Sequence, residues 1–111
     1  MEKLEYGVLQ LLWDAWTPSQ ERIVKSSDQD FVIAVIKQLL EIKQHLNNVC
    51  LEPGSYEKAM NEIVDIISLS QNWLRKFGLN PDSITALIKD RVESRYVGKT
   101  EEILDKYEWK Q

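Results

Sequence analysis

The sequence predicts an all-α protein built from four main helices joined by short turns. Apolar residues recur every three to four positions in several long segments, and no segment alternates as a strand would. The three prolines, Pro18, Pro53 and Pro81, all fall between these segments. Proline interrupts helices because it lacks an N–H and restricts the residue before it. With 111 residues, of which 43% are hydrophobic, the chain fits a single domain over residues 1–111.

The first two helices are expected at about residues 3–16 and 28–48. The polar stretch 17–27, which contains Pro18, predicts a loop with one short turn. Ser27 is the expected N-cap of the second helix, because a serine hydroxyl can accept from the first free N–H groups. The second helix has one wide apolar stripe, expected to face the core: Val32, Val35, Ile36, Leu39, Ile42, Leu46 and Val49.

Two apolar residues of the second helix, Ile33 and Leu40, lie off this stripe. A second apolar line on a helix indicates a second packing surface, such as a partner subunit. The core of so short a chain is also modest. We therefore expect the chain to associate with itself, as a homodimer or a homotetramer that completes the bundle.

The third helix is expected at about residues 56–77, with Ser55 as its cap. Gly78 is well suited to end it, because glycine readily adopts the left-handed conformation of a C′ residue. Its apolar face contains Met60, Ile63, Ile67, Leu74 and Phe77.

The sequence Asn80-Pro81-Asp82 predicts the start of the fourth helix, which should run to about Tyr96. Gly98 interrupts the pattern, and Thr100 can cap a last short helix to about residue 107. Residues 108–111 are expected to fray, with Trp109 able to dock.

The composition excludes several classes of function. Lys and Arg number 14 against 18 Asp and Glu, a net charge of −4, so we expect no nucleic-acid partner. One histidine, His45, and one cysteine, Cys50, cannot form an internal disulfide or a Cys/His zinc site. No apolar run approaches the roughly 18 residues that span a bilayer. We therefore expect a cytoplasmic protein with no membrane partner.

Two helices each present a polar pair three residues apart. Glu62 and Asp65 lie on one face of the third helix, and Glu41 and Gln44 on one face of the second. Two antiparallel helices with such pairs can surround a hard divalent cation with oxygen ligands. Magnesium is the expected ion, because it prefers carboxylates and keeps waters that a phosphate can replace.

At this point the sequence resembles the MazG-like all-α nucleoside triphosphate pyrophosphohydrolases. Their E-x-x-E motif is similar to Glu41 and Gln44 here, and their E-x-x-D motif matches Glu62 and Asp65. The helix, glycine turn and next helix that follow are similar as far as Arg95-Tyr96. The resemblance covers about residues 28–97 and implies a MazG-like helical bundle.

The resemblance implies Mg²⁺-dependent hydrolysis of a nucleoside triphosphate to the monophosphate and pyrophosphate. Glu41, Glu62 and Asp65 would be the catalytic carboxylates, and these three together with Gln44 would hold the metal. The residues implied in nucleotide binding are Lys37, Trp73, Arg91 and Arg95.

Three alternatives remain open. Gln44 stands where the family has an acid, so the chain can instead be a catalytically degenerate nucleotide-binding or protein-interaction module. Trp73 can belong to the core rather than stack on a base, and Arg91 and Arg95 can form surface ion pairs. Base and sugar preference depends on the shape of the pocket, which motif spacing does not determine.

Overall fold

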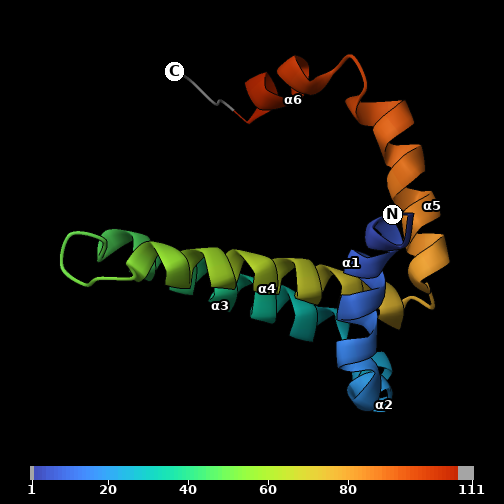
Figure 1. The fold of residues 1–111 in the computed structure, drawn as a ribbon, viewed down its shortest axis with the longest axis horizontal. Coiled ribbons are helices and arrows are strands. Elements are labelled where there is room, and N and C mark those ends of the chain that lie inside the picture. Colours follow the sequence, from blue (N-terminus) through green and yellow to red (C-terminus); the bar gives the residue numbers. More distant parts are fainter. Residues whose placement is uncertain (1, 108–111) are drawn as a thin grey trace. The chain divides into compact units, whose positions relative to one another are not determined.

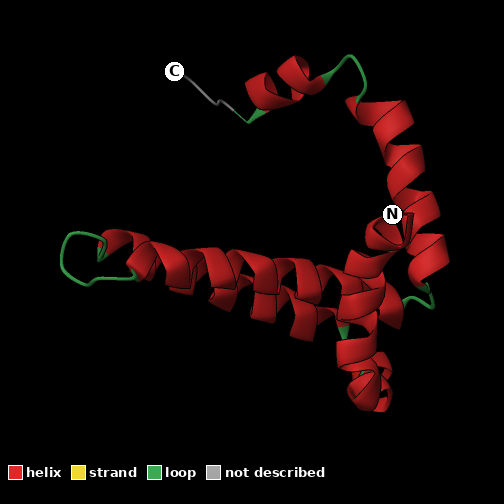
Figure 2. Cartoon of the chain, viewed as in Figure 1, coloured by secondary structure: helices red, strands yellow, loops and turns green. Residues whose placement is uncertain are grey.

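The protein is all-α, as predicted. The structure, a computed structural model, describes residues 2–107, with side chains from Gly7 onwards. Every regular element in this range is helical, and none of it is a strand (Figure 2). The elements are α1 (Glu2–Trp16), the 3-10 helix η1 (Thr17–Ser19), α2 (Gln20–Lys25), α3 (Asp28–Asn47), α4 (Ser55–Lys76), α5 (Pro81–Arg91), the π-helix η2 (Val92–Tyr96) and α6 (Thr100–Lys106).

The chain divides into two compact units, one ending at Asn80 and one beginning at Pro81. The expected single domain over residues 1–111 stays a prediction. Among the described helices, none combines the length and the apolar character that crossing a membrane requires.

The first unit is built on an antiparallel hairpin of α3 and α4, which lie side by side along their length (Figure 1). The Phe31 ring of α3 stacks on the Trp73 ring of α4, with centroids 5.7 Å apart. Phe31 is buried, as are Ala59 of α4 and Ile23 of α2.

Polar side chains of α4 hold α1 in place. The Arg75 guanidinium lies 3.3 Å from the centroid of the Trp13 ring and donates to the Trp13 carbonyl and the Thr17 hydroxyl, both at 3.1 Å. The Gln71 amide donates to the Leu9 carbonyl at 2.9 Å. These bonds anchor the second half of α1 against the last turns of α4.

The prediction of a loop over residues 17–27 was wrong, because most of this stretch is the helices η1 and α2. Pro18 lies in the first turn of η1, where a missing N–H breaks no helical bond. The Thr17 hydroxyl donates to the Trp13 carbonyl at 2.8 Å and joins α1 to η1. The proline therefore marks a change of helix rather than the end of helical structure.

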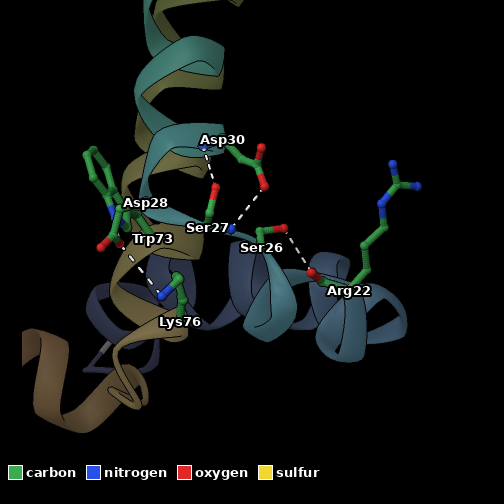
Figure 3. A network of polar contacts seen from close by, with 7 residues as sticks. All are labelled: Arg22, Ser26, Ser27, Asp28, Asp30, Trp73 and Lys76. Carbon is green, nitrogen blue, oxygen red and sulfur yellow. Dashed lines mark hydrogen bonds and ion pairs between the residues drawn. The ribbon is translucent and has the colours of Figure 1, made fainter.

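The predicted N-cap of α3 is confirmed. The Ser27 hydroxyl accepts from the Asp30 N–H at 3.1 Å, and the Asp30 carboxylate accepts from the Ser27 N–H at 2.9 Å (Figure 3). This reciprocal pair is a capping box, which satisfies two N–H groups that the first turn leaves free.

The two ends of α4 differ in how well they were predicted. Ser55 is not the cap: it is the first helical residue, and its hydroxyl donates to the Glu52 carbonyl at 2.9 Å. The cap is Gly54, whose φ of +83° is left-handed. At the other end Gly78 has φ +92°, and the Leu79 N–H donates to the Leu74 carbonyl, as in a Schellman motif.

The second unit begins with α5 at Pro81, as predicted, and stays helical to Tyr96. Its last turn is a π-helix, in which the Val97 N–H donates to the Val92 carbonyl at 2.9 Å. Thr100 is the first residue of α6 rather than its cap, which is Lys99. The expected fraying and docking at residues 108–111, Trp109 included, lie outside the described residues.

The apolar stripes of α3 and α4 are not the core that the sequence indicated. Six of their residues, here called the apolar face, are 45–56% exposed in the hairpin: Ile36, Leu39, Leu46, Met60, Ile63 and Ile67. Ile33 and Leu40 are also exposed. The four-helix bundle and its completion by a second copy therefore remain proposals.

Candidate functional site

The polar residues of α3 and α4 meet on one side of the hairpin. The Gln38 side-chain amide donates to the Glu62 carboxylate, to the Glu62 carbonyl at 3.2 Å and to the Asp65 carboxylate at 3.3 Å. Glu41 lies one turn further along α3, close to the Glu62 carboxylate. The antiparallel helices thus bring Gln38 and Glu41 against Glu62 and Asp65.

Crowding of carboxylates changes the ionisation of Glu62. A hydrogen bond with the Glu41 side chain raises the pKa of Glu62, and partial desolvation and the negative charges of Glu41 and Asp65 raise it further. The Gln38 amide acts in the opposite direction, because its N–H group stabilises the charged form. The negative charges of Glu41 and Asp65 therefore both act on the Glu62 carboxylate.

Gln44 is not the residue that faces Glu62 and Asp65. The hydrogen bonds of Gln38 show that the pairing is shifted by one helical turn. Gln44 is exposed on the turn beyond Glu41, nearer the loop that joins the helices. Spacing alone allows either register, since Gln38 and Glu41 are three residues apart just as Glu41 and Gln44 are. The structure therefore places Gln38, and not Gln44, beside Glu62 and Asp65.

The donor chemistry of this cluster fits Mg²⁺, because carboxylate and amide oxygens are its preferred protein ligands. The arrangement, however, is not a preformed metal site. Among residues 2–107 no three His, Cys, Asp or Glu side chains are placed to hold an ion. The Gln38 N–H group instead lies between Glu62 and Asp65. A metal ion bound here would also need the negative charge of the nucleotide phosphates to hold it.

A groove runs beside the cluster between α3, α4 and the end of α1. Its first part, the acidic pocket, has a volume of about 420 Å³ and is lined by Ser68 together with Gln38, Glu41 and Asp65 of the cluster. Its second part, the Asn72 pocket, has a volume of about 380 Å³. Both parts share Trp16, Ala34 and Leu69, so they are continuous. The acidic pocket is lined by Trp16, Ala34, Lys37, Gln38, Glu41, Asp65, Ser68 and Leu69.

The residues implied in nucleotide binding lie in different places. Lys37 is exposed and lines the acidic pocket, one turn before Glu41. Trp73 lines neither pocket: its ring stacks on Phe31, and its indole N–H donates to the Asp28 carboxylate at 2.9 Å. Figure 3 shows Asp28 between Trp73 and Lys76, whose amino group lies 3.7 Å from the same carboxylate oxygen.

Arg91 and Arg95 belong to the second unit, at the end of α5 and in η2. Their expected contact with the triphosphate remains a prediction. The π-helical turn that carries Arg95 was not predicted, although such turns often occur at functional sites.

Three residues of the groove were missed from the sequence. Trp16, 40% exposed, lines both pockets, and Ser68 and Asn72 are only 7% and 4% exposed. Asp65, Ser68 and Asn72 are three and four residues apart on α4, and this helical spacing could have predicted that Ser68 and Asn72 lie on the same side as Asp65. The signal for Trp16 was an aromatic residue at a helix end beside a polar segment.

No protein-family model, curated protein or solved structure matches the chain. The resemblance to the MazG-like enzymes therefore depends on the motifs in the sequence.

Proposed function

We propose that the chain is a Mg²⁺-dependent nucleoside triphosphate pyrophosphohydrolase of the cytoplasm. The observation that carries the proposal is the meeting of Gln38 and Glu41 with Glu62 and Asp65 beside a groove. Oxygen ligands from two facing helices suit a hard cation, and the acidic pocket beside them has room for phosphates.

Each part of this site has a chemical role in the proposal. Glu41, Glu62 and Asp65 supply the negative oxygens, and Lys37 places a positive charge at the acidic pocket for the phosphate oxygens. Bound Mg²⁺ would neutralise charge on the phosphates and lower the pKa of a water molecule. A carboxylate of the cluster would take the proton from the attacking water. Hydrolysis would separate the α-phosphate from the β-phosphate.

The test is release of pyrophosphate from a panel of nucleoside triphosphates, with and without Mg²⁺. We expect Mg²⁺-dependent release that Glu62→Gln lowers by about a hundredfold or more, since a charged ligand becomes neutral. Glu57→Gln is the matched control, because Glu57 is exposed on the same helix and lies outside the groove. Equal release by both variants and the parent would reject the site.

A second candidate function is a nucleotide-binding module without turnover. It is favoured by Gln38, an amide where a fourth acid would stand, and by the lack of a preformed metal site among the described residues. Mg²⁺-dependent nucleotide binding, with no pyrophosphate release from any nucleoside triphosphate of the panel, would identify this module.

We also propose that a second copy of the chain covers the apolar face. Helical spacing places its residues on the side of the hairpin opposite the groove. Two such hairpins, packed face to face about a two-fold axis, would form a four-helix bundle with a shared core. This dimer leaves both grooves open, and a tetramer made from two such dimers is the alternative assembly.

A further inference from the structure

One row of polar side chains on α4 leads from the acidic cluster into the Asn72 pocket. Asp65, Ser68 and Asn72 are three and four residues apart and so share one side of the helix. Over seven residues an α-helix advances by about 10.5 Å, a span comparable to that from an α-phosphate across a ribose to its base. The row thus has the length and direction of a nucleotide.

This row ends at the side-chain amide of Asn72. Asn72 is 4% exposed and lines the pocket, and its side chain makes no hydrogen bond with the described residues. Among the described residues, the fully buried side-chain polar atoms without a partner belong to Gln71 and Arg75 and not to Asn72, so the Asn72 amide is open to the pocket. An N–H donor and a carbonyl acceptor are therefore available at the inner wall of the pocket.

Part of the pocket suits a flat ring, and Arg22 and Asp30 also line it. Trp16 presents an aromatic wall where the two pockets join, and Ala34 and Leu69 add apolar surface. Aromatic rings stack on nucleobases with little regard to sequence. Adjacent donor and acceptor groups, by contrast, distinguish one base edge from another.

We propose that Asn72 is a specificity-determining residue that reads the edge of a nucleobase lying on Trp16. The inference rests on the proposed function, and it deepens that function by naming how the base is selected. Phosphates lie at Asp65, the sugar passes Ser68, and the base edge bonds the Asn72 amide. Trp16 supplies affinity for any base, and Asn72 supplies the preference.

The test is calorimetric titration of the full chain, in Mg²⁺, with α,β-methylene triphosphates of the four common bases. Ribose 5′-triphosphate serves as the probe without a base, and tripolyphosphate as the probe without a sugar. We expect the parent to bind one base at least tenfold more tightly than ribose 5′-triphosphate. This comparison needs no variant and therefore does not depend on one folding.

Asn72→Leu keeps the side-chain volume but removes both hydrogen-bonding groups. We expect affinity for the preferred base to fall about tenfold to a hundredfold, with affinity for ribose 5′-triphosphate unchanged. Trp16→Leu should weaken all four bases alike. Asn61→Leu is the control, because Asn61 is exposed on α4 and lines neither pocket. Circular dichroism checks that each variant keeps its helicity.

Two results would overturn the assignment of Asn72 while leaving the proposed function intact. One is a folded Asn72→Leu protein with the same base ranking as the parent. The other is a parent that binds ribose 5′-triphosphate as tightly as every nucleotide. If no probe binds, tripolyphosphate included, the proposed function fails together with the inference.

Discussion

The two sides of the α3–α4 hairpin contrast in chemistry and in burial. On one side, polar residues of α4 are covered: Ser68 and Asn72 are 7% and 4% exposed beside the groove. On the other side, the apolar face is about half exposed, Ile63 and Ile67 included. The helix therefore buries polar side chains while its apolar stripe stays uncovered.

This contrast shows what an amphipathic pattern does and does not specify. The pattern identifies the stripe that gains most free energy from leaving water, but it does not say which surface covers that stripe. In the first unit, α1 packs against α4 through polar anchors such as Arg75. Side chains that bind α1 or line the groove are thereby buried, and the apolar face is left for another partner.

The largest expected effect tests the apolar face. Ile63→Glu places a charge in the proposed interface, and two-fold symmetry makes the change act twice. We expect the dissociation constant of the dimer to rise at least about a hundredfold, measured by sedimentation. Asn61→Glu, two residues away on α4, should leave association unchanged. A parent chain that sediments as a 13.0 kDa monomer at micromolar concentration would reject the proposed dimer.

The next effect tests the polar anchor. Arg75→Met keeps most of the aliphatic stem but removes the bonds to Trp13 and Thr17 and the cation–π contact. Burial lowers the pKa of Arg75, and its Nε and Nη1 have no partner among the described residues, which offsets part of the loss.

We therefore expect Arg75→Met to lower the free energy of unfolding by about 1–2 kcal/mol, measured in urea. Lys58→Met is the control: its ion pair with Glu52 is exposed, so the loss should stay below about 0.5 kcal/mol. A more stable Arg75→Met protein would show that the buried charge destabilises the fold on balance.

The register of the acidic cluster gives a third prediction. Gln38→Glu adds a carboxylate directly beside Glu62 and Asp65, so Mg²⁺ affinity should rise about tenfold by calorimetry, after screening by solvent. Gln44→Glu adds the same charge on the turn beyond Glu41 and should change the affinity less than about twofold. The reverse ranking would restore the pairing of Glu41 and Gln44 with the second motif.

The smallest effect concerns pH. The pKa of Glu62 is raised above its ordinary value near 4.5, chiefly by the hydrogen bond with Glu41. Its contribution to stability is therefore present below pH 4.5 and is lost as pH rises through the raised pKa. Without Mg²⁺ the urea midpoint should fall across this range, and Glu62→Gln should remove that part of the fall. Identical pH profiles for parent and variant would contradict the crowding of the carboxylates.

Local signals in the sequence predicted much of the fold because they act over a few residues. The Ser27 capping box, the Gly78 turn and the start of α5 at Pro81 each depend on neighbours within one helical turn. The stretch 17–27 was missed because polar residues and a proline resemble a loop, whereas contacts with Trp13 and Arg75 favour η1.

For the site, the sequence by itself predicted that a polar pair of α3 would face Glu62 and Asp65 of α4, since a short turn makes the two helices antiparallel. Only the tertiary structure decided the register, because Gln38 and Gln44 are equivalent in spacing and only packing separates them. The same holds for Asn72 and Trp16, which are 56 residues apart and share a pocket only once α1 docks on α4. Helical periodicity is a local property, whereas the coverage of each face is set by contacts between distant segments.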